Sequence, residues 1–214
     1  MDTAKAFNPQ TILLWRKAAD HPEAQRILGL FPKAEVRIVE RQRVTPEFNG
    51  SAGKALVAGK RTIMIGQTSR FVGYFNGRLG PNVRCKSYYK LVPVSNGCPY
   101  YCTYCYLAFI YRKYAPFIKI NINYDAMFKQ IRRTVTTSDR IVSFNMGEML
   151  DSLALDHVTN LSTMLVPFFA NFPRGFLVLL TKSGNVVINT GNAVSINSSM
   201  KDIIIVVFYI IHFW

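Results

Sequence analysis

The sequence predicts an α/β fold in which a βαβαβ core follows a smaller mixed region. In the second half of the chain, apolar runs alternate with segments of helical periodicity. The run Phe176–Thr181 is almost continuously apolar, which is typical of a parallel strand buried on both faces. A chain of 214 residues can build one good core with a small additional subdomain. We expect a basic mixed α/β region at 1–80, a partial β/α core at 81–187 and a divergent apolar tail at 188–214.

The first region is expected to begin with two short helices on either side of the break at His21-Pro22. These helices span Pro9–Ala19 and Glu23–Leu30. Two strands and two irregular segments follow: strands at Lys33–Glu40 and Arg61–Gly66, a Gly-rich loop at Phe48–Gly59 and a turn at Gly77–Pro81.

The core is expected to contain three strands joined by two helices, with right-handed crossovers. The strands are Lys90–Val94, Arg140–Asn145 and Phe176–Thr181. The helices are Tyr124–Thr134, capped by Asn123, and His157–Ala170, capped by Asp156. In parallel sheets the chemistry lies at the carboxyl ends of the strands. The segments that follow the three strands should therefore meet on one rim.

The segment after the first strand contains three cysteines, Cys98, Cys102 and Cys105, in a C-x3-C-x2-C pattern. A four-iron cluster normally takes four thiolates, so three leave one iron open. This spacing is the signature of radical S-adenosylmethionine (SAM) enzymes, in which the open iron binds SAM. The expected cofactors are therefore a [4Fe-4S] cluster and SAM, and the expected fold is a partial radical SAM (β/α) barrel of about three βα units. Structural zinc is the alternative, although it prefers a fourth protein ligand.

The segments after the other two strands supply candidate SAM ligands. Gly147-Glu148 follows the second strand, where radical SAM proteins often carry a Gly-Gly-Glu element that receives the methionyl ammonium. Lys182 follows the third strand and could pair with the SAM carboxylate. Tyr104 and Tyr106 flank the last cysteine; Tyr106 could contact the adenine of SAM, or both rings could simply pack the loop.

Charge indicates the class of partner. The chain has 26 Lys and Arg against 12 Asp and Glu, a net charge of +14. The first 107 residues carry 16 of the basic groups and 6 of the acids. This concentration favours a nucleic-acid partner, although a solvated basic surface is the alternative. No apolar run approaches the roughly 20 residues of a membrane-spanning helix. With no secretory signal at the start, we expect a cytoplasmic protein without a membrane partner.

From about Arg61 to Val186 the chain resembles the spore photoproduct lyase family of radical SAM proteins. The matching segments are Ser95–Leu107, Phe144–His157 and Thr181–Val186. The resemblance implies DNA repair with a low-potential electron donor such as flavodoxin or ferredoxin. It also implies that a 5′-deoxyadenosyl radical removes a hydrogen atom from a methylene-bridged thymine dimer. Tyr104 and Tyr106 fall on the family's tyrosine positions, and Lys182 falls on its SAM-carboxylate lysine.

Two departures from the family pattern modify these expectations. Aligned with the family, Glu148 stands where the lesion-repairing enzyme has its hydrogen-donating cysteine, so we expect a relative whose substrate the sequence does not identify. After Val187 the resemblance stops, which predicts a truncated or frameshifted reading of a longer enzyme; alternatively, Ile203–Phe208 supplies one more strand. The competing functional hypotheses are an iron–sulfur or zinc nucleic-acid-binding protein without radical chemistry, and an inactive fragment.

Overall fold

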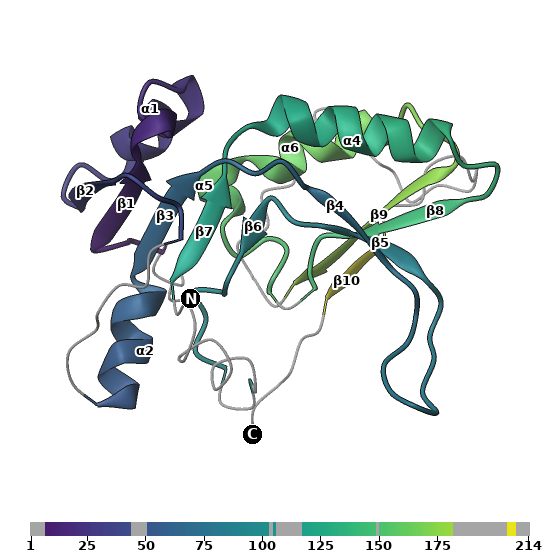
Figure 1. Ribbon diagram of the computed structural model, residues 1–214, viewed down its shortest axis with the longest axis horizontal. Coiled ribbons are helices and arrows are strands. Elements are labelled where there is room, and N and C mark those ends of the chain that lie inside the picture. The colour runs from purple at the N-terminus through teal and green to yellow at the C-terminus, as the bar shows by residue number, and fades with distance from the viewer. Residues whose placement is uncertain are drawn as a thin grey trace. The chain divides into compact units, whose positions relative to one another are not determined.

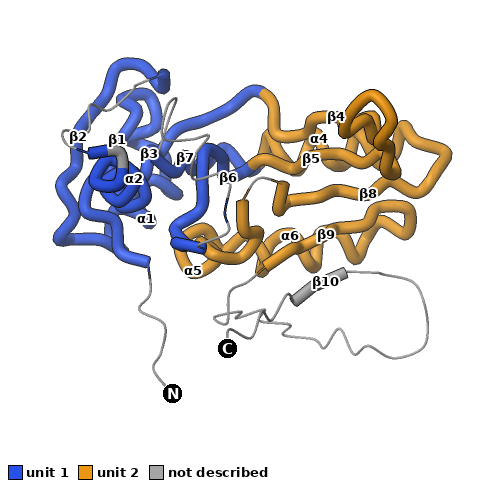
Figure 2. The backbone as a smooth tube through the Cα atoms, turned by 90° about the horizontal axis from the view of Figure 1, so that it is seen from below, with its two compact units in different colours: residues 1–69, 93–124 blue, residues 70–92, 125–214 orange. Residues whose placement is uncertain are grey.

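The fold consists of two compact units, each assembled from separate stretches of the chain. A computed structural model describes residues 7–43, 51–102, 105, 117–148, 150–181 and 205–208. Unit 1 combines residues 1–69 and 93–124, and unit 2 combines residues 70–92 and 125–214 (Figure 2). The predicted regions have linear boundaries at 80 and 187, whereas the chain passes between the units after residues 69, 92 and 124.

Unit 1 contains a five-stranded sheet in the order β2-β1-β3-β7-β6. The strands are β1 (Thr11–Trp15), β2 (Glu35–Val39), β3 (Thr62–Gly66), β6 (Val94–Ser95) and β7 (Ile118–Asn121). The first four strands in this order are parallel, and β6 pairs with β7 in the antiparallel sense. The apolar residues of the central strands are buried, so this sheet forms the core of the unit.

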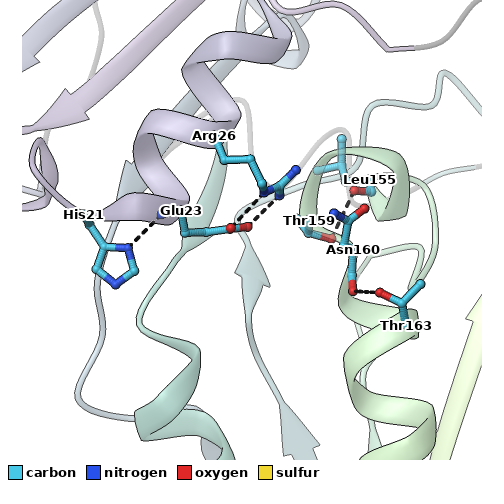
Figure 3. Close-up of polar contacts among 7 residues, drawn as sticks. All are labelled: His21, Glu23, Arg26, Leu155, Thr159, Asn160 and Thr163. Atoms are coloured by element: carbon cyan, nitrogen blue, oxygen red, sulfur yellow. Dashed lines mark hydrogen bonds and ion pairs between the residues drawn. The ribbon is translucent and has the colours of Figure 1, made fainter.

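Helix α1 (Pro22–Leu30) begins where the break at His21-Pro22 predicts. The His21 Nδ1 atom accepts a hydrogen bond from the backbone N–H of Glu23 at 3.2 Å, and Pro22 lacks the N–H that a first helical turn leaves unbonded. Arg26 then pairs with the Glu23 carboxylate at 2.6 Å, one turn along (Figure 3).

Two predictions for unit 1 are wrong. The segment Pro9–Ala19 forms β1 and a short 3-10 helix, η1 (Arg16–Ala18), instead of an α-helix. Tertiary pairing decides here, because β1 lies between two parallel neighbours and buries its three central residues. Helix α2 (Ala52–Lys60) occupies much of the expected loop Phe48–Gly59. Ser51 caps this helix, because its hydroxyl accepts a hydrogen bond from the N–H of Lys54 at 3.5 Å.

Unit 2 contains a second five-stranded sheet in the order β10-β9-β8-β5-β4. The strands are β4 (Val72–Phe75), β5 (Tyr88–Leu91), β8 (Val142–Asn145), β9 (Gly175–Thr181) and β10 (Ile205–Phe208). All neighbouring pairs are parallel except β4 with β5. The predicted α/β class with parallel strands is confirmed. Strand β10 lies within Ile203–Phe208, where the alternative to truncation expected one more strand. Closure into a partial barrel stays a prediction.

Aromatic side chains join the helices of unit 2 to its sheet. Helices α4 (Tyr124–Thr136) and α6 (Leu161–Phe169) cover one face (Figure 1). Phe144 of β8 is fully buried, and its ring centroid lies 5.3 Å from that of Phe169. Phe128 and Phe168 join the two helices at 4.6 Å. Helix α4 confirms the predicted helix that begins at Tyr124. The side chain of the preceding residue, Asn123, accepts the N–H of Thr68 and donates to the carbonyl of Thr68.

The predicted strand Lys90–Val94 is divided between two sheets. Its first part belongs to β5 in unit 2, and its last residue belongs to β6 in unit 1. Pro93 lies at the division, and a proline cannot donate a ladder hydrogen bond. Its carbonyl accepts instead from the N–H of Asn121 at 2.9 Å, which starts the pairing with β7.

The predicted helix His157–Ala170 is also divided. Helix α5 (Asp156–Thr159) ends at Asn160, which has a left-handed φ of 51°, and α6 begins next. The Asp156 carboxylate caps α6 rather than α5, because it accepts the N–H of Ser162 at 2.8 Å. Thr163 donates to the carbonyl of Asn160 at 2.7 Å and completes this first turn (Figure 3). Within the described ranges, no helix is both long and apolar enough to cross a bilayer.

Replacing Phe144 should strongly destabilise unit 2. Phe144→Ala deletes a fully buried ring that stacks on Tyr89 at 5.5 Å, and such deletions cost about 4 kcal/mol. Ile141→Ala is the control, because Ile141 is 67% exposed and should change the free energy of unfolding by less than about 0.5 kcal/mol. Urea denaturation followed by circular dichroism measures both. Equal losses in the two variants would contradict the packing described.

Candidate active site

The three cysteines lie in a loop of unit 1 that follows β6. Asn96 and Gly97 start this loop with positive φ angles of 65° and 152°, and Gly97 thus adopts a conformation that favours glycine. Cys98, Cys102 and Cys105 are all half-buried. The N–H of Cys105 donates to the carbonyl of Cys102 at 3.0 Å, so a backbone hydrogen bond joins the last two cysteines of the motif.

A buried lysine holds this loop from outside the motif. Lys60, the last residue of α2, is only 8% exposed. Its Nζ donates to the carbonyl of Cys98 at 2.7 Å and to the carbonyl of Tyr100. The same ammonium lies 5.1 Å from the ring centroid of Tyr101. A loop without regular pairing needs partners for its carbonyls, and Lys60 provides two of them.

The donor chemistry of the loop fits an iron–sulfur cluster. All four cysteines of the chain are among the described residues, and none of them forms a disulfide. Within the described part of the chain, no three His, Cys, Asp or Glu side chains are gathered as a metal-ion site. Ligands are commonly gathered only when the metal binds. Three partly exposed thiols in one short loop therefore suit the cluster by their number and type.

The segment after β8 approaches the end of β9 too closely for a side chain at Gly147. A Cβ atom there would lie 2.6 Å from the Oγ of Ser152 and 3.1 Å from the Cβ of Leu180. The Ser152 Oγ also accepts the N–H of Leu180 at 2.8 Å. Asp151 accepts the hydroxyl of Thr181 at 2.8 Å. Gly147 therefore lets the β8 segment dock on the last residues of β9, directly before Lys182.

Glu148 forms an ion pair with Lys90 of β5. The Lys90 Nζ lies 2.7 Å from the Glu148 Oε1, and the two side chains are 35% and 23% exposed. The ammonium also lies 5.0 Å from the ring centroid of Phe75. The second carboxylate oxygen, Oε2, is buried and has no hydrogen-bond partner within the described structure. A buried oxygen of this kind can accept a hydrogen bond from a bound ligand.

Tyr88 is the third polar group beside Glu148. Burial raises the pKa of Tyr88 to about 12, and the negative charge of Glu148 adds to the increase. Tyr88 and Lys90 are two positions apart on β5 and so share one face of the strand. Tyr89 faces the other way, towards Phe144 and the helices.

The structure describes five of the eight residues that the sequence predicts for the site. The three cysteines belong to unit 1, and Gly147 and Glu148 belong to unit 2. Tyr104, Tyr106 and Lys182 lie outside the described residues. Sequence reasoning missed Lys60, Lys90 and Tyr88. The period-2 alternation of Tyr88–Leu91 could have placed Tyr88 and Lys90 on a common face, whereas no local pattern indicates the role of Lys60.

Comparisons with known sequences find relatives of one kind. A family model described as "Spore photoproduct lyase" matches residues 7–194. The spore photoproduct lyase of Geobacillus sp. (strain Y412MC61) is 23% identical over 187 residues, which are 85% of this chain and 52% of the relative. The spore photoproduct lyase of Clostridium acetobutylicum is 30% identical over 116 residues, or 53% of this chain and 32% of the relative.

Solved structures agree with this relationship at the level of the fold. A spore photoproduct lyase variant with bound AdoMet and dinucleoside spore photoproduct matches with a TM-score of 0.69 and 20% identity, over 86% of this chain and 52% of that one. The enzyme complexed with dinucleoside spore photoproduct matches with a TM-score of 0.68 and 21% identity, over 83% and 51%. The chain thus spans about half the length of the relatives it matches. The match across residues 7–194 shows that the chain belongs to the spore photoproduct lyase family.

Proposed function

We propose that the chain is a radical SAM enzyme that carries a [4Fe-4S] cluster on Cys98, Cys102 and Cys105 and acts on a base of DNA or another nucleic acid. The observation that carries the proposal is the C-x3-C-x2-C loop with three partly exposed thiols, held by Lys60, in a chain of this family. The cluster and SAM, when bound, supply a 5′-deoxyadenosyl radical by reductive cleavage of SAM. Family membership does not favour a binding protein without this chemistry.

The chain's own residues would orient SAM and control hydrogen transfer. The Glu148 Oε2, which is buried and lacks a partner in the described structure, is suited to accept a hydrogen bond from the methionyl ammonium. Gly147 supplies the close backbone, and Lys182 would pair with the SAM carboxylate. Tyr104 and Tyr106 would contribute a hydrogen-atom relay, with Tyr106 also against the adenine. A partial (β/α) barrel would position these groups, and a low-potential flavodoxin or ferredoxin would supply the electron.

The substrate should differ from that of the curated relatives. Their name denotes action on the spore photoproduct, and three of the similar structures contain its dinucleoside form. The resemblance of Phe144–His157 to the family aligns Glu148 with the family's hydrogen-donating thiol. A carboxylate has no hydrogen atom to donate, and the O–H bond of the protonated carboxylic acid is too strong to replace a thiol in that role. We therefore propose a different base modification as the substrate, with the hydrogen atom returned by another group.

The cluster assignment is tested by removing one thiol at a time. After anaerobic reconstitution, the wild-type chain should hold about four irons and give a reduced EPR signal that SAM perturbs. Cys98→Ala, Cys102→Ala and Cys105→Ala should each lose the signal. Cys85→Ala is the matched control, because Cys85 is exposed and lies outside the motif. An unperturbed signal in the wild type, or a loss in Cys85→Ala, would overturn the assignment.

Lys60→Met should weaken cluster binding without changing a ligand. The substitution keeps the length of the side chain but removes the donor to the carbonyls of Cys98 and Tyr100. We expect several-fold lower iron content and a lower reduction potential, because a positive charge near the cluster favours its reduced state. Lys54→Met on the exposed side of α2 is the control. Unchanged iron content and potential in folded Lys60→Met would show that the lysine does not organise the loop.

Glu148→Gln should weaken the binding of SAM. A hydrogen bond to a charged group contributes about 2 kcal/mol, so the dissociation constant should rise by about 30-fold. Equilibrium dialysis on the reconstituted protein measures the constant directly. Asp139→Asn, at an exposed position of the same unit, should leave it unchanged. Equal affinities for wild type and Glu148→Gln would remove Glu148 from the SAM site.

A further inference from the structure

Strands β4 and β5 of unit 2 continue beyond their sheet as a two-stranded arm. We call residues 76–87 the arm; in Figure 1 it is the long hairpin that extends to the lower right, below the label β5. The N–H of Cys85 donates to the carbonyl of Gly77 at 2.8 Å, and the N–H of Leu79 donates to the carbonyl of Val83 at 3.0 Å. Arg78 and Arg84 form an antiparallel bridge between these bonds. Backbone pairing therefore fixes the arm as a ribbon.

Gly77 allows the two strands of the arm to approach closely at its base. Its φ angle is 83°, and a Cβ atom there would lie 2.2 Å from the carbonyl oxygen of Cys85. Any other residue would have to separate the two strands at this point. The arm thus has a defined backbone shape although its sequence contains few apolar residues that could pack.

The side chains of the arm are basic along its length and apolar near its tip. Arg78, Arg84 and Lys86 are exposed. Leu79 and Val83, which face each other across the ribbon, are 64% and 56% exposed. Among the ion pairs of the described residues, none includes a residue of the arm. These two apolar side chains therefore leave most of their surface to solvent on a basic ribbon.

The sequence around the arm is basic throughout. Residues 48–124 contain eleven Lys and Arg residues and no Asp or Glu. A segment of this charge attracts a polyanion and repels basic surfaces. A two-stranded ribbon also has the width that the major groove of a duplex admits. The charge and the shape of the arm therefore suit the same partner.

We propose that the arm docks on double-stranded DNA, with Arg78, Arg84 and Lys86 on phosphates and Leu79 and Val83 against the groove. This inference rests on the proposed action on nucleic acid but not on the cluster chemistry. It assigns the initial contact with the duplex to the arm, separately from the residues that would bind cofactors. An anionic membrane is a weaker fit, because two aliphatic side chains bury little area in a bilayer.

The salt dependence of binding tests the phosphate contacts. Fluorescence anisotropy of a labelled duplex of about 20 bp gives the affinity of the full chain between 50 and 200 mM salt. The triple variant Arg78→Ala, Arg84→Ala, Lys86→Ala should reduce the slope of log K against log salt by about 0.9 per lost contact, up to about 3 in total. The control, Lys129→Ala with Arg133→Ala and Arg140→Ala, removes the same charge from exposed positions elsewhere in unit 2 and should leave the slope unchanged. Equal slopes for the two triple variants would overturn the proposal.

Further measurements distinguish DNA docking by the arm from the alternatives. Cys85 is exposed on the arm, so duplex DNA should slow its alkylation by maleimide, as followed by peptide mass spectrometry. Leu79→Ser with Val83→Ser should weaken duplex binding without changing the salt slope.

Binding of the wild type to anionic phosphatidylserine vesicles but not to duplex would overturn the arm's role together with the nucleic-acid part of the proposed function. SAM cleavage that persists in the arm variants, with duplex binding lost, would support the arm and leave the radical chemistry intact.

Discussion

The buried ammonium of Lys60 is the interaction on which the cysteine loop depends. The loop has little regular pairing, so without Lys60 its carbonyl groups would have to bond with water. Water should be excluded from a loop that is proposed to hold a cluster. One ammonium at the end of α2 binds two of these carbonyls and lies against a tyrosine ring. The helix thus sets the position of the loop through charge rather than through apolar packing. A cluster on the loop would also lie within the field of that charge.

The sequence predicted the elements whose burial pattern repeats over many residues. The helix at Tyr124 and the strands β8 and β9 are of this kind, because apolar periodicity reports the same burial that stabilises them. The helix at Pro9–Ala19 was wrong because β1 gains its stability from two neighbouring strands that lie far away in sequence. The strand at Lys90–Val94 was divided because Pro93 ends the pairing with one sheet and its carbonyl starts pairing with another.

The candidate site could be predicted only where the chemistry depends on residue type and spacing. Three cysteines within eight consecutive positions can be recognised from the sequence alone. The Lys90–Glu148 pair joins residues 58 positions apart, and the contact of Lys60 with Cys98 joins residues 38 positions apart. Such pairs arise from strand order and helix placement, which a single sequence does not encode locally. Gly147 is intermediate: its position after a strand indicated a site, but only the structure shows that Ser152 and Leu180 leave little room for a side chain there.

Tyr88 also determines how this face of β5 responds to acidity. Burial, and after it the Glu148 carboxylate, raises the pKa of Tyr88 to about 12, because both oppose a phenolate there. Tyr88 therefore remains a neutral phenol throughout the physiological range, able to donate a hydrogen bond whatever the acidity of the surroundings. Lys90 meanwhile keeps the neighbouring carboxylate in an ion pair. A ligand at this face would meet a tyrosine whose charge is constant, so any variation of its affinity with pH would originate elsewhere, in the ligand or in other ionisable groups.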